Sequence, residues 1–555
     1  MADSVSGTIH ALCDRYVDDY AALDPNAATY LGVPGHDDRL TDYSSEGHRA
    51  RAELHAAALR AIRAATPQDD SEAAARDTFT ERVGLDLEIH EAGLDSAALN
   101  VIESPVQALC MLFDVMPTRT SDDWSVIASR LARMPEAIAG LEAGLRHAAA
   151  GGRVSALRQV TKTAAQCDTW ADGHFATLVA PAQVPSALRA DLDAGAAAAS
   201  SAFAGLARFL REGLAPVAPA RDAVGPDAYA LWLRYFTGAE LDPKESYAWG
   251  WEEFCRIETE LKQIADRIRP GATPAEAAAA LDADPHYRLR GADALRDWMQ
   301  RLSDAALSDL RGSHFEIPDE LMALECLIAP PGGIVGAYYT GPTDDFSRPG
   351  RMWWSIPPGR TDFPTWREVT TVYHEGVPGH HLQVATAVHQ SGRLNRFQRL
   401  MCHVSGYGEG WALYAERLMR ELGRLDDNGD LLGMLAGQLF RAARVIVDIG
   451  MHLELPIPVG TGFHEGERWT PELGLEFMLT RTITQQDQVR DEIDRYLGWP
   501  GQAPSYKLGE RQWLAARDDA RARQGATFDA MAFHTAALKL GPMGLDTLRG
   551  RLAAL

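Results

Sequence analysis

The chain has 555 residues, of which 46% are hydrophobic and 24% are charged, as is ordinary for a globular protein. Its formal net charge is −23, with 77 acidic against 54 basic residues. Nucleic acids and anionic membrane surfaces attract basic patches, so this balance argues against a nucleic-acid or membrane partner. No run of about 18 apolar residues occurs, and residues 1–6 lack the features of a secretory signal. We therefore expect a cytoplasmic protein.

Six cysteines are scattered along the chain, and none forms a C-x-x-C pair, which argues against a cysteine-based metal site. A chain of this length buries a large core and does not need disulfides. We expect mostly buried free thiols.

Helix-forming composition dominates the first 215 residues. Helical spacing of apolar residues predicts a helix over 6–23, and Pro25 suits the first turn of the next one. Further helices are predicted at 45–66, 70–97, 122–150, 155–178 and 185–213. Proline and glycine then interrupt the pattern at 216–226. This break predicts an N-terminal helical part, 1–215, and a catalytic helical part, 216–555; one continuous domain is the alternative.

The second part is again helical, at 227–237, 243–269, 274–282 and 291–311. Residues 314–357 differ, because aromatic and β-branched runs bounded by glycine and proline predict short strands. A helix follows from Trp366 to about Val377, with Thr365 as its N-cap. The remaining predicted helices are 382–390, 396–422, 429–455, 470–497 and 506–523. The predicted fold class is mostly α, with a small β element before the helix that ends near Val377.

The segment 373–383, Y-H-E-G-V-P-G-H-H-L-Q, concentrates groups that bind metals. Neutral imidazole is a common zinc ligand, and a neighbouring carboxylate can act as general base for water. His374 and Glu375 begin the zinc-peptidase motif H-E-x-x-H, but Pro378 stands where the second histidine belongs. Later histidines are poorly placed on a regular helix. Pro378 and Gly379 permit a break that brings a later imidazole back toward His374.

We expect His380 to be the second ligand because it follows the glycine directly, with His381 in reserve. Glu409, on the following predicted helix, completes a His2Glu set for zinc or another divalent ion, one per chain. Glu416 shares a helix face with Glu409 and is either a hydrogen-bond partner of a ligand or a solvated charge. The alternatives are chance histidines at a helix end and a structural zinc.

Together with 374–383 and 409–416, the segments 24–32, 444–452 and 496–509 resemble the bacterial domain-of-unknown-function family 885. The resemblance spans nearly the whole chain. That family is regarded as gluzincin-like, related in fold to thimet oligopeptidase, angiotensin-converting enzyme and the Taq-type carboxypeptidases. The resemblance implies a large helical metallohydrolase with a deep cleft, and it does not imply a particular substrate.

Arg444, Asp448 and His452 follow at four-residue spacing and share one helix face. They predict either a row that orients His452 toward a developing oxyanion or a buried network that joins helices. By analogy with gluzincins, the resemblance implies that Tyr506 donates to the oxyanion and that Lys507 binds a substrate carboxylate. Core packing is the alternative for Tyr506, and solvent exposure is the alternative for Lys507.

Tyr496 and Gln502 lie in the same C-terminal motif and are further candidates for substrate binding. Tyr339 belongs to a predicted strand before the H-E helix, and in related folds such a strand pairs with an extended substrate. Arg348 and Arg351, nearby, are candidates to meet a negative substrate end. For Tyr339, Arg348 and Arg351, ordinary packing is the alternative.

The leading hypothesis is a zinc-dependent hydrolase of an amide bond in short peptides. His374, His380 and Glu409 hold the zinc, and Glu375 takes a proton from water. One alternative is a metal-dependent enzyme that acts on a non-peptide C–N bond in a biosynthetic pathway. Another is a catalytically inactive scaffold that binds peptides. The expected partner is a short peptide or small amide, and the sequence does not indicate an oligomeric state.

Overall fold

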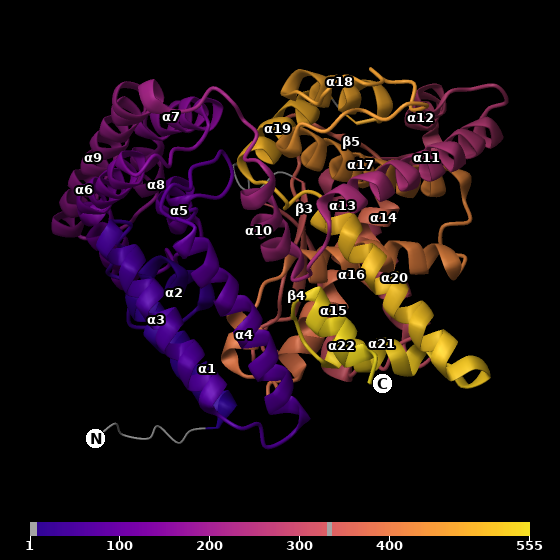
Figure 1. Ribbon diagram of the computed structural model, residues 1–555, viewed down its shortest axis with the longest axis horizontal. Coiled ribbons are helices and arrows are strands. Elements are labelled where there is room, and N and C mark those ends of the chain that lie inside the picture. The colour runs from indigo at the N-terminus through magenta and orange to yellow at the C-terminus, as the bar shows by residue number, and fades with distance from the viewer. Residues whose placement is uncertain (1–7, 330–335, 485, 555) are drawn as a thin grey trace. The chain divides into compact units, whose positions relative to one another are not determined.

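The computed structural model describes residues 8–329, 336–484 and 486–554 (Figure 1). Helices make up 67% of the chain and strands 4%, which confirms the predicted mostly α fold class. Within these ranges no helix is both long and apolar enough to cross a membrane. Contacts group the chain into one unit of Met1–Leu231 with Asp491–Pro500, and another of Trp232–Arg490 with Gly501–Leu555. The first division thus falls after Leu231, whereas the sequence placed it after residue 215.

The first unit consists of helices packed around an apolar core, in which α6 lies against α9 and α3 against α4. Its α-helices are α1 (Ile9–Leu23), α2 (Pro25–Leu31), α3 (Ser45–Ala64), α4 (Asp70–Glu91), α5 (Pro105–Met111), α6 (Ser121–Ala150), α7 (Leu157–Ala171), α8 (His174–Val179) and α9 (Ser186–Phe209). Short 3-10 helices are η1 (Leu112–Asp114) and η3 (Ala215–Val217), and η2 (Leu210–Leu214) is a π-helical turn.

A late segment of the chain completes this unit. Helix α19 (Gln486–Gly498) supplies Asp494, whose carboxylate lies 2.6 Å from Lys162 Nζ and 3.4 Å from an Arg158 guanidinium nitrogen. The Asp494 carbonyl oxygen accepts a hydrogen bond of 2.9 Å from Gln159 Nε2. These contacts attach residues distant in sequence to α7.

The second unit contains the remaining α-helices, and α10 spans the division between the units. They are α10 (Pro226–Thr237), α11 (Pro243–Ile268), α12 (Pro274–Ala283), α13 (Ala292–Leu310), α14 (Val369–Glu375), α15 (His380–His389), α16 (Ser405–Glu421), α17 (Asn428–Leu453), α18 (Pro471–Arg481), α20 (Ser505–Gln524), α21 (Ala530–Lys539) and α22 (Leu545–Leu552). Short 3-10 helices are η4 (Pro285–Tyr287), η5 (Asp319–Met322) and η7 (Gly525–Thr527), and η6 (Phe397–Met401) is π-helical.

Two small sheets belong to the second unit. Strands β2 (Leu324–Ile328), β4 (Gly350–Trp354) and β3 (Ala337–Thr340) form one sheet in the order β2-β4-β3. Strand β2 runs parallel to β4, and β3 runs antiparallel to it with Tyr338 opposite Trp353. This sheet confirms the predicted strands in 314–357. Strands β1 (Arg288–Arg290) and β5 (Asp362–Pro364) form an antiparallel pair that the sequence did not indicate, because three residues are too few for a periodic pattern.

Helices α16 and α20 approach closely because glycines face each other. A Cβ on Gly410 would lie 2.5 Å from the carbonyl carbon of Gly509, and one on Gly509 would lie 2.1 Å from the carbonyl oxygen of Gly406. Only hydrogen fits at these positions. The crossing fixes α16, which carries Glu409, against α20, which carries Tyr506.

All six cysteines carry free thiols, and five of them are buried, as predicted; Cys255 is exposed. Burial raises the pKa of Cys326 to about 11, so this thiol stays protonated at neutral pH. The structure therefore gives the five buried thiols a packing role.

Candidate metal centre

The helix that carries the H-E pair is shorter than predicted. Thr365 belongs to a hydrogen-bonded turn, in which its carbonyl oxygen accepts from the Glu368 N–H at 2.8 Å, and α14 begins only at Val369. The expectations of an N-cap at Thr365 and a helix start at Trp366 were therefore wrong. The helix ends at Glu375, two residues before the predicted end, because the backbone of Gly376 leaves the helical region.

A tight turn over 376–379 joins α14 to α15, and its Val377–Pro378 peptide bond is cis. A Cβ on Gly379 would lie 1.9 Å from the His374 carbonyl oxygen, so the turn requires glycine there. Helix α15 begins at His380, directly after this turn. As a result the His374 and His380 rings lie edge to face, with centroids 4.9 Å apart.

Glu409 of α16 meets both rings. Its Oε2 atom lies 3.2 Å from His374 Nε2 and 3.7 Å from His380 Nε2. Ligand atoms around a tetrahedral zinc, with bonds of about 2.0–2.1 Å, lie about 3.3 Å apart. The longer contact exceeds a hydrogen bond but suits two ligands of one ion. These three donor atoms, all within 4.8 Å of one another, therefore fit a zinc-sized cation.

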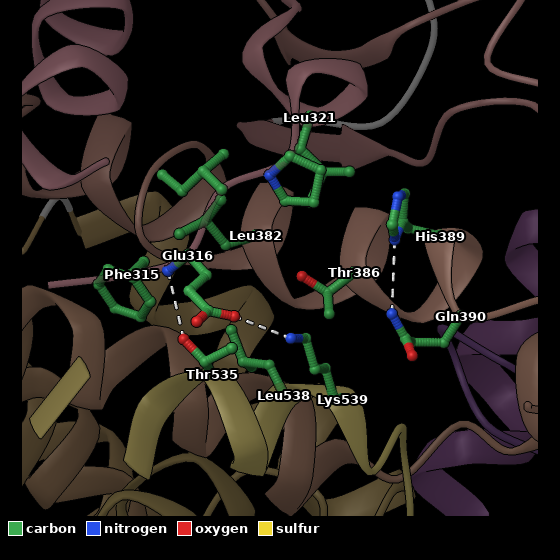
Figure 2. A pocket seen from close by; sticks show the side chains of 12 residues that line it. Phe315, Glu316, Leu321, Leu382, Thr386, His389, Gln390, Thr535, Leu538 and Lys539 are labelled. Atoms are coloured by element: carbon green, nitrogen blue, oxygen red, sulfur yellow. Dashed lines mark hydrogen bonds and ion pairs between the residues drawn. The ribbon is translucent and has the colours of Figure 1, made fainter. Parts of the chain in front are cut away.

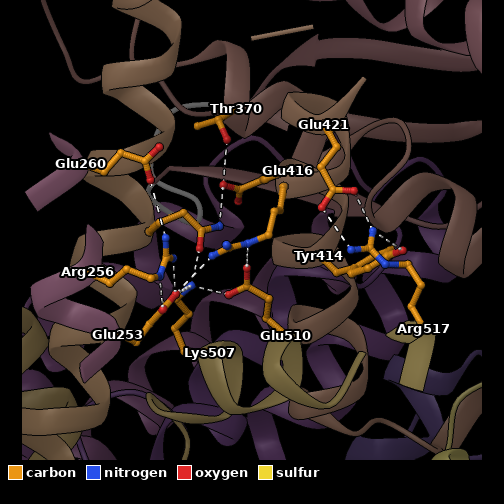
Figure 3. A network of polar contacts seen from close by, with 12 residues as sticks. Glu253, Arg256, Glu260, Thr370, Tyr414, Glu416, Glu421, Lys507, Glu510 and Arg517 are labelled. Atoms are coloured by element: carbon orange, nitrogen blue, oxygen red, sulfur yellow. Dashed lines mark hydrogen bonds and ion pairs between the residues drawn. The ribbon is translucent and has the colours of Figure 1, made fainter. Parts of the chain in front are cut away.

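Glu416 supports His374 from the side away from Glu409. It is 1% exposed, and its Oε1 atom lies 2.8 Å from His374 Nδ1. Its Oε2 atom accepts hydrogen bonds from Thr370 Oγ1 at 2.7 Å (Figure 3) and from Gln438 Nε2 at 3.3 Å. A carboxylate on Nδ1 orients the ring so that Nε2 faces the metal position. The structure thus places Glu416 behind a candidate ligand and not in solvent.

The cluster carries excess negative charge without a cation. Burial alone lowers the pKa of His374, but hydrogen bonds to Glu409 and Glu416 outweigh burial and raise it to about 10. Burial raises the pKa of Glu409, yet its contacts with His374 and His380 bring it well below the ordinary value. Two ionised carboxylates around one imidazole form an environment that favours a divalent cation.

His381 lies outside this cluster. Its Nε2 atom is 2.8 Å from the Leu321 carbonyl oxygen, and its Nδ1 atom is 3.0 Å from the Tyr339 hydroxyl. Burial lowers the pKa of His381 to about 4, so the ring is neutral at pH 7. Nε2–H then donates to Leu321, and Nδ1 accepts from Tyr339. Of the two candidates for second ligand, the structure brings His380 to Glu409 and engages His381 elsewhere.

A cavity of about 520 Å³ adjoins the cluster, within the second unit. Its wall includes Glu375, the three candidate ligands, and the predicted site residues Tyr339, Arg444 and Tyr506. It also includes polar side chains that the sequence did not single out, namely Gln383, Arg399, His403, Tyr407 and Arg441. Arg441 carried a signal that was missed, since it precedes Arg444 by three residues on the same helix face.

Other predicted site residues lie outside the cavity wall. His452 and Asp448 are fully buried, and Asp448 Oδ2 accepts a hydrogen bond of 3.0 Å from the Gly501 N–H. This contact joins α17 to the turn before α20, whereas Arg444 of the same predicted row lines the cavity. Gln502 is buried and donates to Ser405 Oγ at 3.4 Å. Tyr496 is fully buried in α19, among residues grouped with the first unit.

Lys507 is also absent from the cavity wall. It is fully buried, with Nζ at 2.9 Å from Glu253 Oε1 and 2.6 Å from Gln438 Oε1, and it also pairs with Glu510 (Figure 3). Both expectations for Lys507, a substrate clamp and an exposed side chain, are therefore wrong. Helix α20 turns Lys507 away from the cavity because Tyr506, one residue earlier, occupies the cavity-facing position.

The face of α15 opposite the cavity is packed. Leu382, Thr386 and His389 line a hollow of only about 20 Å³ against α21 (Figure 2). Glu316 pairs with Lys539 of α21 at 2.9 Å across this hollow. Packing against α21 thus fixes α15, the helix that carries His380, on the side away from the cavity.

A model of the family "Bacterial protein of unknown function (DUF885)" matches residues 25–552. The chain belongs to this family. No curated protein matches the sequence of this DUF885 protein at a significant level.

Two solved structures share its fold. The crystal structure of a "putative lipoprotein" from Colwellia psychrerythraea matches with a TM-score of 0.83 and 22% identity, over 98% of both chains. A second such protein, of unknown function, from Shewanella oneidensis has a TM-score of 0.77 and 16% identity, over 99% of this chain and 100% of its own. The predicted cytoplasmic location of the present chain stays a prediction.

Proposed function

We propose that this DUF885 protein is a zinc-dependent metallohydrolase that cleaves an amide bond in short peptides, with one zinc per chain. The observation that carries the proposal is the meeting of His374 Nε2, His380 Nε2 and Glu409 Oε2 at separations that suit zinc ligands. The same donor set supports the proposed relationship to gluzincins. Glu416 behind His374 adds the carboxylate–histidine pairing found around such metals.

Bound zinc would supply Lewis acidity, which polarises an amide carbonyl and lowers the pKa of water. Glu375 follows the ligand His374 directly, is 9% exposed and lines the cavity. It takes the proton of the attacking water and returns it to the leaving amine nitrogen. Tyr506, also in the cavity wall, donates a hydrogen bond from its hydroxyl group to the developing oxyanion. His452 lies outside the cavity wall and has no such role in this proposal.

The sheet favours a peptide over another amide. Strand β3 pairs with β4 on one side, and in the described sheet it is an edge strand. Residues 337–339 of this strand line the cavity. An edge strand binds an extended peptide through main-chain hydrogen bonds. The cavity volume of about 520 Å³ suits a short segment of a peptide.

Metal analysis and peptide hydrolysis test the proposal. The purified protein should bind about one zinc, and a chelator should abolish hydrolysis of a library of short peptides. Glu375→Gln should keep zinc and lower kcat by about 10²- to 10⁴-fold, because the proton acceptor is gone. His374→Ala should lose zinc. As a matched control, Glu472→Gln replaces an exposed carboxylate on α18 and should change neither property.

Full activity of Glu375→Gln, or undiminished zinc binding by His374→Ala, would contradict the proposal. The library should include non-peptide amides, since hydrolysis of these alone would favour the biosynthetic alternative. Zinc binding without turnover of any compound would favour the inactive scaffold.

A further inference from the structure

The cavity beside the metal cluster has a cationic wall. Among the described residues, its lining includes three arginines, Arg441 and Arg444 of α17 and Arg399 of η6, against two glutamates, Glu375 and Glu409. A divalent cation at the cluster would balance both glutamates, so these carboxylates would not also neutralise the arginines. Three arginines around one cavity stand out in a chain whose net charge is −23.

Arg441 lacks a carboxylate partner. Its Nη1 atom donates only to the Gly437 carbonyl oxygen, at 3.3 Å, and its buried Nε atom has no hydrogen-bond partner. Within the described ranges no carboxylate lies at ion-pair distance from it. Its guanidinium carbon is 6.0 Å from the centroid of the Tyr506 ring, and that of Arg444 is 4.9 Å from the same centroid. A guanidinium beside a cavity with no carboxylate in contact with it is available to an acidic group of a ligand.

Two further donors in the wall are unsatisfied. Arg399 is paired with Asp344 at 2.9 Å, but its side chain is only 10% exposed and its Nε atom has no partner. The Tyr407 hydroxyl is buried and likewise has none in the part of the chain that the structure describes. Buried polar groups are normally satisfied, so these donors point to an acceptor-rich ligand.

We propose that the cavity takes substrates that carry a carboxylate close to the scissile amide, and that Arg441 binds this carboxylate with Arg399 and Arg444 nearby. The inference rests on the proposed hydrolase function and narrows its substrate class. A guanidinium suits the role because its planar fork matches a carboxylate with two parallel hydrogen bonds. The carboxylate belongs either to the C-terminus of a peptide or to an acidic side chain next to the cleaved bond.

Four matched peptides test this assignment on the zinc-loaded full chain. They combine a free or amidated C-terminus with a neutral or acidic residue after the scissile bond. We expect kcat/KM to be about 10- to 100-fold higher for peptides with a carboxylate than for the amidated neutral peptide, the range of a charged hydrogen bond. If the free C-terminus raises kcat/KM, the recognised carboxylate is that of the peptide terminus. If the acidic residue raises it, the recognised carboxylate is that of the side chain. Faster hydrolysis of the amidated neutral peptide, or equal rates for all four, would overturn the inference.

Arg441→Gln should reduce this preference to about twofold or less, whereas Arg441→Lys should restore part of it. Arg399→Gln provides a second variant if Arg441→Gln unfolds at a lower temperature. Arg296→Gln removes an exposed arginine of α13 and should not change the preference. If both Arg441→Gln and Arg399→Gln kept the preference for peptides with a carboxylate, the arginines would not bind this group and the inference would be wrong. The carboxylate would then contact the metal alone.

Calorimetric binding of the same peptides separates this inference from the hydrolase proposal. Binding that favours carboxylates and depends on Arg441, without any hydrolysis, would support the inference and contradict the hydrolase. Hydrolysis without a preference for carboxylates would support the hydrolase proposal and contradict the inference. If no peptide bound or was cleaved, both proposals would be wrong.

Discussion

Glu416 shows how one buried carboxylate determines the chemistry of a neighbouring ring. Its contact with His374 Nδ1 places a proton there, so a bound metal would displace the proton of the opposite nitrogen, Nε2, which lies 3.2 Å from Glu409 Oε2. The carboxylate is itself fixed by Thr370 and Gln438. Gln438 also accepts from Lys507, so a continuous polar chain extends from the candidate metal centre into the buried charges of α20.

We expect Glu416→Gln to weaken zinc binding about 10- to 100-fold, because a neutral amide holds the His374 ring less firmly. Competition with a chromogenic chelator measures this affinity. Glu421→Gln is a matched control, since Glu421 is an exposed residue of the same helix that pairs with Arg517 and not with a candidate ligand. Equal affinities for Glu416→Gln and the unaltered protein would show that Glu416 does not orient the ligand.

The raised pKa of His374 predicts that zinc binding depends on pH. Since this pKa is about 10 without metal, the ring is protonated at pH 8. Zinc requires the neutral ring, so binding at pH 8 should release about one proton from it. Affinity should therefore rise with pH, by about tenfold per unit, and level off near the pKa. Calorimetry in buffers of different ionisation enthalpy counts the protons, and an affinity independent of pH between 7 and 9 would contradict this.

The crossing of α16 and α20 is the element on which the site depends. We expect Gly410→Ala to destabilise the protein by about 1–3 kcal/mol, because the new methyl group would overlap the backbone at Gly509. Gly550→Ala in α22 is the matched control: nothing lies within 4 Å of its Cβ position, so it should be neutral or stabilising by up to about 1 kcal/mol. Denaturant unfolding measures the stability of both variants. Equal effects would show that the close approach of α16 and α20 does not determine the stability.

The strongly periodic helices were predictable from the sequence, and their interruptions were not. The predicted helix at 155–178 is two helices, because Gly173 adopts φ of +84° between them. Likewise 470–497 divides into α18 and α19, and 396–422 into η6 and α16, where Val404 is extended. The short helices α5, α21 and α22 went unpredicted. Tertiary contacts fix such breaks, so composition and periodicity do not reveal them.

The residues brought together in the candidate site divide in the same way. His374, Glu375, His380 and Glu409 sit in short motifs whose residue types indicate metal chemistry, so local sequence was enough to single them out. Lys507 was misplaced because adjacent residues of a helix point in different directions, and the phase of α20 was unknown. Arg399 was missed because its place in the cavity wall depends on the π-helical turn of η6, which no local pattern announced.

At the scale of the whole molecule, the net charge of −23 and the cationic cavity wall act in opposite directions on a ligand. An acidic surface repels an anion at long range, and this repulsion is screened by salt over about 10 Å at 0.1 M ionic strength. Contacts inside a buried cavity are screened much less. The composition therefore argues against nucleic acid as a partner without arguing against an anionic substrate.

The order in which the chain assembles its first unit has a consequence for biosynthesis. The segment Asp491–Pro500 belongs to that unit but is made 260 residues after Leu231, the last residue of the preceding part (491 − 231 = 260). At about 5–20 residues per second, the interval is on the order of tens of seconds. During this time Gln159 and Lys162 lack their partner Asp494. The first unit therefore remains incomplete during synthesis, without the segment Asp491–Pro500, until most of the second unit has been made.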